Sequence, residues 1–249
     1  MLLAAFHLRL PPANCSVTPD PRYNPGYVAT SKLPQFDPLT VPVAAVDDHL
    51  PAVNLMALQP QALRDRFNRP PQWQPEFREE PPYAERQTKH AAVLVPIVMR
   101  DVPMVLLTQR TAHLSTHSGQ IAFPGGKVDE TDADVAATAL REAEEEVGLH
   151  RRYVEVIGNL PVYTTGSAFV ITPVVALLTP GFVITPNANE VADVFEVPLA
   201  FLMDPAHHRR HVVEAGGFKR EWLSMPYGER FIWGATAGML RNLYRFLSA

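Results

Sequence analysis

Proline is the residue that most constrains the fold of this chain. Fifteen of its 25 prolines precede Lys89. A segment so rich in proline forms neither a long helix nor a central strand, because proline fixes φ and has no backbone N–H to donate. We therefore expect residues 1–89 to form a proline-rich N-terminal arm and residues 90–249 to form the folded domain. Residues 1–51 should be irregular, whereas Pro60–Phe67 should form a short helix, since Pro60 suits a first turn.

The irregular part of the arm, residues 1–51, has two interpretations. It is either a dimerisation or packing arm, which would make the protein a homodimer, or a loosely ordered extension or the product of an early start codon. We prefer the second interpretation. Met1–Phe6 is apolar but short and lacks a basic leader, so a signal peptide is not expected. No window offers eighteen consecutive apolar residues, so no membrane span is predicted.

Charge and cysteine content limit the partners. The formal net charge is −4, so the chain offers no broad positive surface for nucleic acid. Phosphate binding must then be local, and a small molecule is the expected substrate. The single cysteine, Cys15, cannot form an internal disulfide. This fits a reducing cytoplasm, and a thiol mechanism is not expected.

From His90 onward the pattern becomes that of an α/β domain. Apolar runs bounded by turn residues predict strands, namely Ala92–Met99, Met104–Leu107, Ile121–Phe123, Val154–Leu160, Phe169–Leu178 and Val194–Val197. A helix is predicted to end at Gly148, a short one to run through Met203, and a last one to span Trp233–Leu247. Arg209–Glu214 and Phe218–Ser224 should form a hairpin. This order implies a mixed sheet packed between helices.

Three acids mark the first of these helices as a site. Glu142, Glu145 and Glu146 share one helix face, because they stand at positions i, i+3 and i+4. An apolar face lies opposite, made of Ala136, Leu140, Ala143 and Val147. Clustered acids near a helix C-terminus repel one another and oppose the helix dipole. A divalent cation such as Mg²⁺ removes both penalties, while the simpler alternative is a solvated acidic face.

The segment before the helix fits such a site. Gly125 and Gly126 have no side chains, which allows the backbone to approach a metal or a phosphate closely. Thr131 or Asp132 is predicted to cap the helix. Asp134 would then lie in its first turn, where a negative charge is favourable.

The order of these residues resembles the Nudix box, the signature of Nudix hydrolases. The box reads G, five residues, E, seven residues, R-E-U-x-E-E-x-G-U, where U is aliphatic. The matching residues here are Gly126, Asp132, Arg141, Glu142, Ala143, Glu145, Glu146, Gly148 and Leu149. Asp132 replaces the usual glutamate, and the gap that follows is one residue longer.

This resemblance spans roughly His90 to Leu247 and implies an α/β/α sandwich with a mixed sheet. It also implies metal-dependent hydrolysis of a pyrophosphate. Glu142, Glu145 and Glu146 would hold Mg²⁺ or Mn²⁺, together with a backbone carbonyl of Gly125 or Gly126. Arg141 would orient the carboxylates and is expected to pair with Asp132.

A second motif covers residues 106–126, LLTQRTAHLSTHSGQIAFPGG. It resembles the L-L-T-x-R-S-x-x-x-R-x-H-x-G-x-x-x-F-P-G-G signature of the coenzyme A pyrophosphatase subgroup, with Thr111 for serine and Ser115 for arginine. The resemblance implies coenzyme A or an acyl derivative as substrate, with 3′,5′-ADP and a 4′-phosphopantetheine species as products. Arg110 and Lys127 are the nearest cations for the substrate's phosphates. The loop with Thr165 and Gly166 resembles a substrate loop of this subgroup, or is a plain hairpin turn.

Other interpretations stay open at this stage. The substrate could instead be a dinucleotide or a nucleoside triphosphate, or the domain could be a non-catalytic binding module, although no glutamate of the box is lost. The general base is Glu145, Glu146 or an acid on another loop, such as Glu190. A histidine metal site is also conceivable in the 207–211 segment, but flanking arginines favour an exposed basic surface there. The histidines concerned are His207, His208 and His211.

Overall fold

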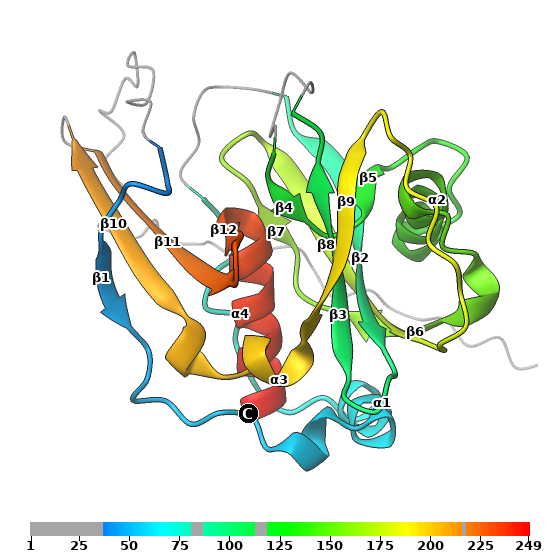
Figure 1. Cartoon of the computed structure of the whole chain (residues 1–249), viewed down its shortest axis with the longest axis horizontal. Helices are drawn as coiled ribbons and strands as arrows, with labels where there is room; N and C mark the ends of the chain where they lie inside the picture. The colour runs from blue at the N-terminus through cyan, green and yellow to red at the C-terminus, as the bar shows by residue number, and fades with distance from the viewer. Residues whose placement is uncertain (1–36, 81–86, 113–118, 216–217) are drawn as a thin grey trace, which may run out of the picture. The chain divides into compact units, whose positions relative to one another are not determined.

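Strand β2, Lys89–Val98, is the centre of the fold. The structure is a computed structural model that describes residues 37–80, 87–112, 119–215 and 218–249. All of these belong to one unit of the chain, Lys32–Ala249. Strand β2 runs parallel to β8, Phe169–Leu178, and antiparallel to β3, Met104–Arg110 (Figure 1). Its nearly continuous apolar run follows from this position, since helices cover both faces of the sheet.

Five further strands complete this mixed sheet. The main path is β4-β3-β2-β8-β6, while β5 pairs with β2, β7 with β8 and β9 with β3. Their bounds are Ile121–Ala122 for β4, Gly125–Lys127 for β5, Val154–Asn159 for β6, Tyr163–Thr164 for β7 and Val191–Pro198 for β9. The predicted strands are therefore confirmed, and β5 and β7 are additions.

Helices lie on both faces of the sheet. On one face, α2, Val135–Val147, packs its small apolar residues against Leu94 and Val98 of β2. On the other face lies α4, Gly234–Ser248, whose Leu240 belongs to the same core cluster as Ile97 of β2. The predicted α/β class with a mixed sheet between helices is thereby confirmed.

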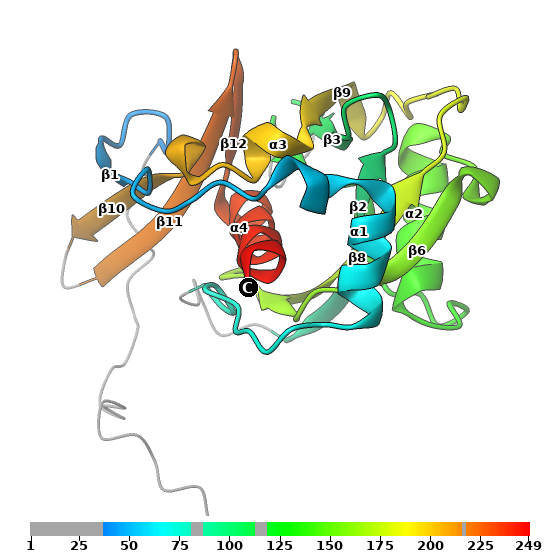
Figure 2. The same cartoon turned by 90° about the horizontal axis from the view of Figure 1, so that it is seen from below.

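A second sheet lies beyond α4, so that this helix is placed between the two sheets (Figure 2). It is antiparallel, with the order β1-β10-β11-β12. The bounds are Val43–Val46 for β1, Arg209–Ala215 for β10, Phe218–Tyr227 for β11 and Arg230–Trp233 for β12. The predicted hairpin is confirmed as β10–β11. The prediction of an irregular chain up to residue 51 is wrong for β1, because β10 offers it an edge to pair with.

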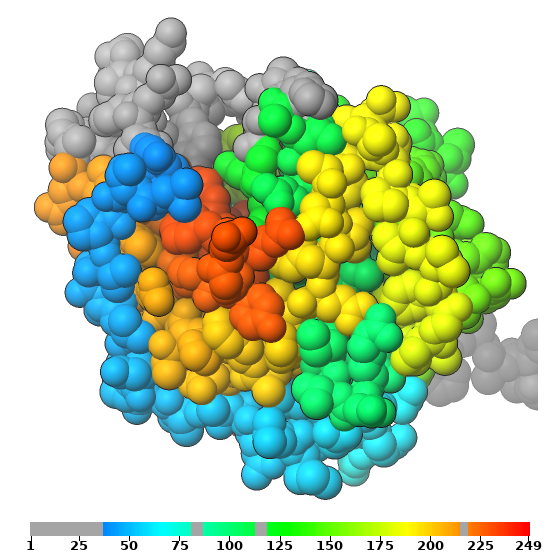
Figure 3. Space-filling view, in the orientation of Figure 1, coloured from blue at the N-terminus to red at the C-terminus, as the bar shows by residue number. Residues whose placement is uncertain are grey.

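Residues 37–80 of the arm pack against the core, so the preferred interpretation of a loosely ordered extension is wrong for residues 37–51, where Asp47 is buried and Leu50 contacts the core. Residues 37–80 also contain a short 3-10 helix, Leu55–Leu58, and α1, Pro60–Asn68, which confirms the predicted short helix. Leu63 of α1 is fully buried. Helix α3 is Leu199–Leu202. In the space-filling view, residues 37–80 run from beside β10 to below α3 (blue to cyan in Figure 3). The predictions for residues 1–36 lie outside the described residues.

Two further 3-10 turns complete the described structure, Arg151–Tyr153 and Pro205–His207. Among the described residues, no helix is both long and apolar enough to cross a membrane.

Candidate active site

The loop before α2 is shaped by two glycines. Strand β5 pairs with Ala91–Val93 of β2, and a Cβ on Gly125 would lie 2.5 Å from the Ala92 carbonyl oxygen. A Cβ on Gly126 would lie 2.3–2.4 Å from the carboxylate atoms of Glu142. Glycine is therefore required at Gly125 for strand pairing, and at Gly126 it lets a carboxylate of α2 touch the loop.

Helix α2 begins at a different cap from the one predicted. Asp134 is the N-cap, and its Oδ1 accepts a 2.8 Å hydrogen bond from the backbone N–H of Ala137. The prediction of Thr131 or Asp132 as the cap is wrong, because Thr131 bonds to Asp129 while Asp132 accepts from Thr138 and from an arginine of the helix. Gly148 ends the helix in a left-handed conformation, as predicted.

That arginine, Arg141, connects most of the predicted site. It donates to both oxygens of Asp132, at 3.0 and 2.9 Å, so the longer gap does not prevent their pairing. Its Nη1 donates to Glu142 at 2.9 Å and to Glu145 at 3.2 Å, and its Nη2 donates to the Lys127 carbonyl at 3.1 Å. The hydrogen bonds from Arg141 hold the pKa of Asp132 well below its usual value. One guanidinium thus fixes the loop and two helix carboxylates together.

Glu146 is the buried acid of the cluster. Its Oε2 accepts a 3.1 Å hydrogen bond from the Gly125 N–H, and its Oε1 lies 3.6 Å from Nη1 of Arg110 at the end of β3. Burial raises the pKa of Glu146 to about 7, although the Gly125 hydrogen bond and the Arg110 charge act in the opposite direction. Burial also raises the pKa of Glu142. These carboxylates are thus less well stabilised as anions than they would be in water.

A loop after β8 brings a fourth acid, Glu190, to the cluster. The N–H of Asn187 donates to the Glu146 carbonyl at 2.8 Å, which satisfies a carbonyl in the last turn of α2. The N–H of Thr111, next to Arg110, donates to the Glu190 carbonyl at 3.0 Å. Burial is the main reason that the pKa values of Glu142 and Glu146 are raised, and the negative charge of Glu190 raises both of them further.

An arginine of the second sheet supports the same edge. Arg230 of β12 donates to Gln109 and to Asp193, and its guanidinium lies 4.6 Å from the ring centroid of Phe195. Gln109 and Asp193 face each other across β3 and β9, immediately before a bulge that precedes Arg110. Bulges of this kind re-aim side chains next to sites. No sequence signal identifies Arg230, since 121 residues separate it from Gln109.

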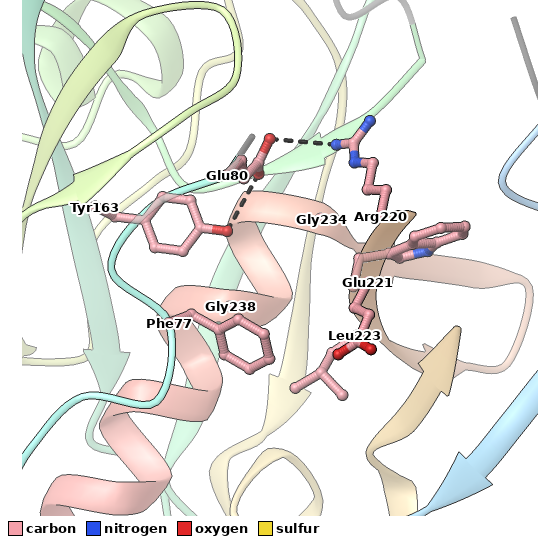
Figure 4. Close-up of a pocket in the computed structure, with 9 residues that line it drawn as sticks. Phe77, Glu80, Tyr163, Arg220, Glu221, Leu223, Gly234 and Gly238 are labelled. Carbon is pink, nitrogen blue, oxygen red and sulfur yellow. Dashed lines mark hydrogen bonds and ion pairs between the residues drawn. The ribbon is translucent and has the colours of Figure 1, made fainter. Parts of the chain in front are cut away.

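The other residues predicted to bind substrate, Lys127, Thr165 and Gly166, lie in two separate parts of the structure. Lys127 is exposed on β5 beside the carboxylates. Thr165 and Gly166 follow β7, and the Gly166 N–H donates to Glu80 at 3.2 Å. Figure 4 shows Glu80 with Tyr163 and Arg220, a group that belongs to the side of α4. The role of Thr165 and Gly166 in substrate binding stays a prediction.

The donor atoms of the cluster suit a hard divalent cation. Carboxylate oxygens of Glu142, Glu145 and Glu146 and the carbonyl of Gly126 are the ligand types that Mg²⁺ and Mn²⁺ take. Gly126 has no Cβ that would push Glu142 away from the loop. Within the described residues, no three acidic, histidine or cysteine side chains already stand in a metal-binding arrangement. These residues are therefore of the right chemical type for a divalent cation. Arg141 donates to oxygens of Glu142 and Glu145, so these two side chains would have to shift to bind the ion.

The histidines are not an exposed basic surface, which corrects that expectation for two of them. His208 and His211 are buried. His208 accepts from Arg241 at 3.0 Å through Nδ1 and so donates to the Leu202 carbonyl at 2.8 Å through Nε2. Burial lowers the pKa of His208 to about 4. The neighbouring Arg210 is paired with Asp47 at 2.7 Å rather than free in solvent.

The glycine loop and the clustered carboxylates of α2, carried by a mixed sheet, define an α/β protein with an acidic site that suits a divalent cation. The family model described as NUDIX domain matches residues 88–215. The chain belongs to this family, whose hydrolases generally need divalent metal cations.

Relatives named "Uncharacterized Nudix hydrolase NudL" occur in Escherichia coli O1:K1 / APEC and in Shigella boydii serotype 18. Each is 47% identical over 166 residues, which is 65% of this chain and 86% of the relative. Among solved structures, the M. Smegmatis Nudix hydrolase RenU is 23% identical with a TM-score of 0.40, covering 47% of this chain and 75% of its own. The C. elegans Ap4A hydrolase binary complex is 20% identical with a TM-score of 0.39, covering 47% and 85%. Because both TM-scores are below 0.5, the family model and the relatives alone define the family.

Proposed function

We propose that this enzyme hydrolyses the pyrophosphate bond of coenzyme A or of an acyl-coenzyme A. The products would be 3′,5′-ADP and a 4′-phosphopantetheine species. The observation that carries the proposal is the position of Arg110, the arginine of the 106–126 motif, 3.6 Å from Glu146 in the carboxylate cluster. Its Nε is buried and has no hydrogen-bond partner in the described part of the chain. A cation with an unused donor at this place suits a phosphate of the substrate.

Glu142, Glu145, Glu146 and the Gly126 carbonyl would hold Mg²⁺ or Mn²⁺. When bound, such an ion lowers the pKa of a coordinated water and neutralises charge on phosphate oxygens. Arg141 keeps the Glu142 and Glu145 carboxylates against the loop through its hydrogen bonds.

Three carboxylates are candidates for accepting a proton, and they are Glu145, Glu146 and Glu190. Glu145 and Glu146 are also proposed metal ligands, and a bound cation lowers the pKa of a carboxyl group that it touches, so either of them would accept a proton only through an oxygen that the ion leaves free. Glu190 is carried by a different loop and is therefore free of the constraint to hold a metal on the helix face.

Substrate binding is assigned to cations and to the glycine-bearing loops. Arg110 and Lys127 flank the cluster from β3 and β5, and they would bind phosphate oxygens together with backbone groups of Gly125 and Gly126. We assign residues 90–249 to the catalytic domain and residues 1–89 to its N-terminal arm. A cytoplasmic location belongs to the same proposal, whereas a homodimer is only the alternative to our preferred interpretation of residues 1–51.

Mass spectrometry of the products tests the substrate. Purified protein is incubated with coenzyme A, NADH or a dinucleoside polyphosphate, with and without Mg²⁺. We expect 3′,5′-ADP from coenzyme A only when the metal is present. If NADH or the dinucleotide is cleaved and coenzyme A is not, the coenzyme A assignment is wrong, while the pyrophosphohydrolase assignment stands.

A further inference from the structure

The carboxylate of Glu80 is held by donors from separate parts of the fold (Figure 4). Its Oε1 accepts from the Tyr163 hydroxyl at 3.1 Å. Its Oε2 accepts from the Gly166 N–H at 3.2 Å and from Nη2 of Arg220 at 3.2 Å. Arg220 and Glu80 are both largely buried, with 9% and 13% of their side chains exposed. The donors therefore lie in a place from which water is mostly excluded.

A phenol hydroxyl, a loop N–H and a guanidinium form a donor set that suits an anion with several oxygens. Each of these groups loses free energy if it is buried without an acceptor, and the Glu80 carboxylate supplies an acceptor to all three of them. We propose that Tyr163, Gly166 and Arg220 form a binding site for a phosphate monoester. Glu80 occupies this site with its own carboxylate when no phosphate is bound.

The size of the adjoining pocket determines how a phosphate could enter. The free space beside Glu80 is about 10 Å³, which is room for a single water molecule. A phosphate therefore cannot bind next to the carboxylate and has to replace it.

Replacement requires the Glu80 carboxylate to turn away from these donors while the backbone of its segment stays in place. The backbone of this segment is fixed beside β7, because the Glu80 N–H donates to the Thr164 carbonyl and the Thr164 N–H donates to the Arg78 carbonyl, each at 2.8 Å. Glu221 also lines the pocket, but Lys219 pairs with it at 2.7 Å and offsets its charge.

This site is separate from the carboxylate cluster. Tyr163 pairs with Ile171, Ile171 with Ala91 and Ala91 with Lys127, so Tyr163 and Lys127 stand in one row across four strands. Three strand spacings amount to about 14 Å. The phosphate monoester is therefore either a distal group of the substrate or a separate phosphate compound. The proposal does not depend on coenzyme A being the substrate.

Binding of inorganic phosphate to the full-length, metal-free protein tests the proposal. It is measured by calorimetry and by the thermal unfolding midpoint, at an ionic strength kept constant with chloride. Glu80→Gln removes the competing charge and should bind phosphate at least tenfold more tightly than wild type. The matched control is Glu79→Gln, which alters an exposed neighbour and should leave phosphate binding unchanged. Arg220→Met in the Glu80→Gln background should abolish the gain.

The proposal is overturned if Glu80→Gln binds phosphate no more tightly than wild type, or if the gain persists without Arg220. Should Arg220→Met not fold, Tyr163→Phe in the Glu80→Gln background replaces it. That variant should weaken phosphate binding severalfold, and undiminished binding would also overturn the site. Kinetics then separate the two sources. If the phosphate belongs to the substrate, Glu80→Gln lowers KM for coenzyme A but not for its 3′-dephospho form. If the site binds a separate phosphate compound, Glu80→Gln leaves both KM values unchanged or changes both by the same factor.

Discussion

Replacing Glu146 by glutamine should inactivate the enzyme and stabilise its metal-free form. The pKa of Glu146 rises from 4.5 to about 7 in the folded protein because the side chain is buried. A group whose folded pKa is raised contributes stability below its unfolded pKa, and this stability is lost as the pH rises through the folded pKa. The shift of 7 − 4.5 = 2.5 units, at 1.36 kcal/mol per unit, corresponds to about 3 kcal/mol. Most of this loss falls between pH 5 and pH 8.

Glutamine keeps the shape of the side chain and an acceptor for the Gly125 N–H, but it carries no charge. The difference in unfolding free energy between Glu146→Gln and wild type should therefore grow by roughly 2–3 kcal/mol from pH 5 to pH 8. Urea unfolding in the presence of a chelator measures it, and the midpoint should differ by about 1 M at pH 8. Turnover should fall by orders of magnitude, since a proposed metal ligand is lost.

Glu144→Gln is the matched control, because Glu144 is exposed on the same helix. It should change neither the activity nor the pH dependence of stability. Added Mg²⁺ should stabilise wild type at pH 8 more than it stabilises Glu146→Gln. A stability difference between Glu146→Gln and wild type that is equal at pH 5 and pH 8 would refute the reasoning, and so would near-normal turnover.

Substitutions at four other residues test the remaining parts of the site. Arg141→Lys keeps the charge but loses the fork that bonds several acceptors, so metal affinity in a titration and activity should fall together. Gly126→Ala should lower kcat at least tenfold and leave the unfolding free energy within about 1 kcal/mol, since its Cβ displaces only the flexible end of Glu142. Arg230→Met should raise KM severalfold, because Arg230 supports the sheet edge that carries Arg110. Arg230→Lys keeps the positive charge and should raise KM less. If the 3′-phosphate lies at the carboxylate cluster rather than beside Arg220, Arg110→Ala should erase a ten- to hundredfold preference for coenzyme A over its 3′-dephospho form in kcat/KM, the size of one hydrogen bond to a charged group.

Local periodicity predicts the centre of this site well. Glu142 and Glu146 share a face because their spacing is that of one helical turn, and Gly148 ends the helix because it tolerates a left-handed backbone. The cap could not be predicted in the same way. Several acceptors precede the helix, and the choice of Asp134 depends on Arg141 and Thr138 engaging Asp132.

Contacts between distant segments could not be predicted. His208 belongs to a stretch of basic residues in the sequence, yet burial lowers its pKa to about 4, and its Nδ1 accepts a hydrogen bond from Arg241 of α4. The neighbouring Arg210 is bound by Asp47, which is 163 residues away in the sequence. A run of arginines and histidines has the same composition whether solvent or acids from another segment surround it, so sequence alone does not decide between the two.

The second sheet explains why the site depends on residues beyond the matched NUDIX stretch. Residues 88–215 contain the carboxylate cluster and Arg110, but Arg230 and Arg220 come from strands of the second sheet that lie after this stretch. Arg230 reaches the edge of β3 and β9 beside the cluster, while Arg220 reaches Glu80, which lines a pocket with Gly234 and Gly238 of α4. The same hairpin, β11–β12, thus supports both of the places that we propose for phosphorylated ligands. A truncation after residue 215 would remove both supports together with α4, so its loss of activity would not separate their roles, whereas Arg230→Met and Glu80→Gln do.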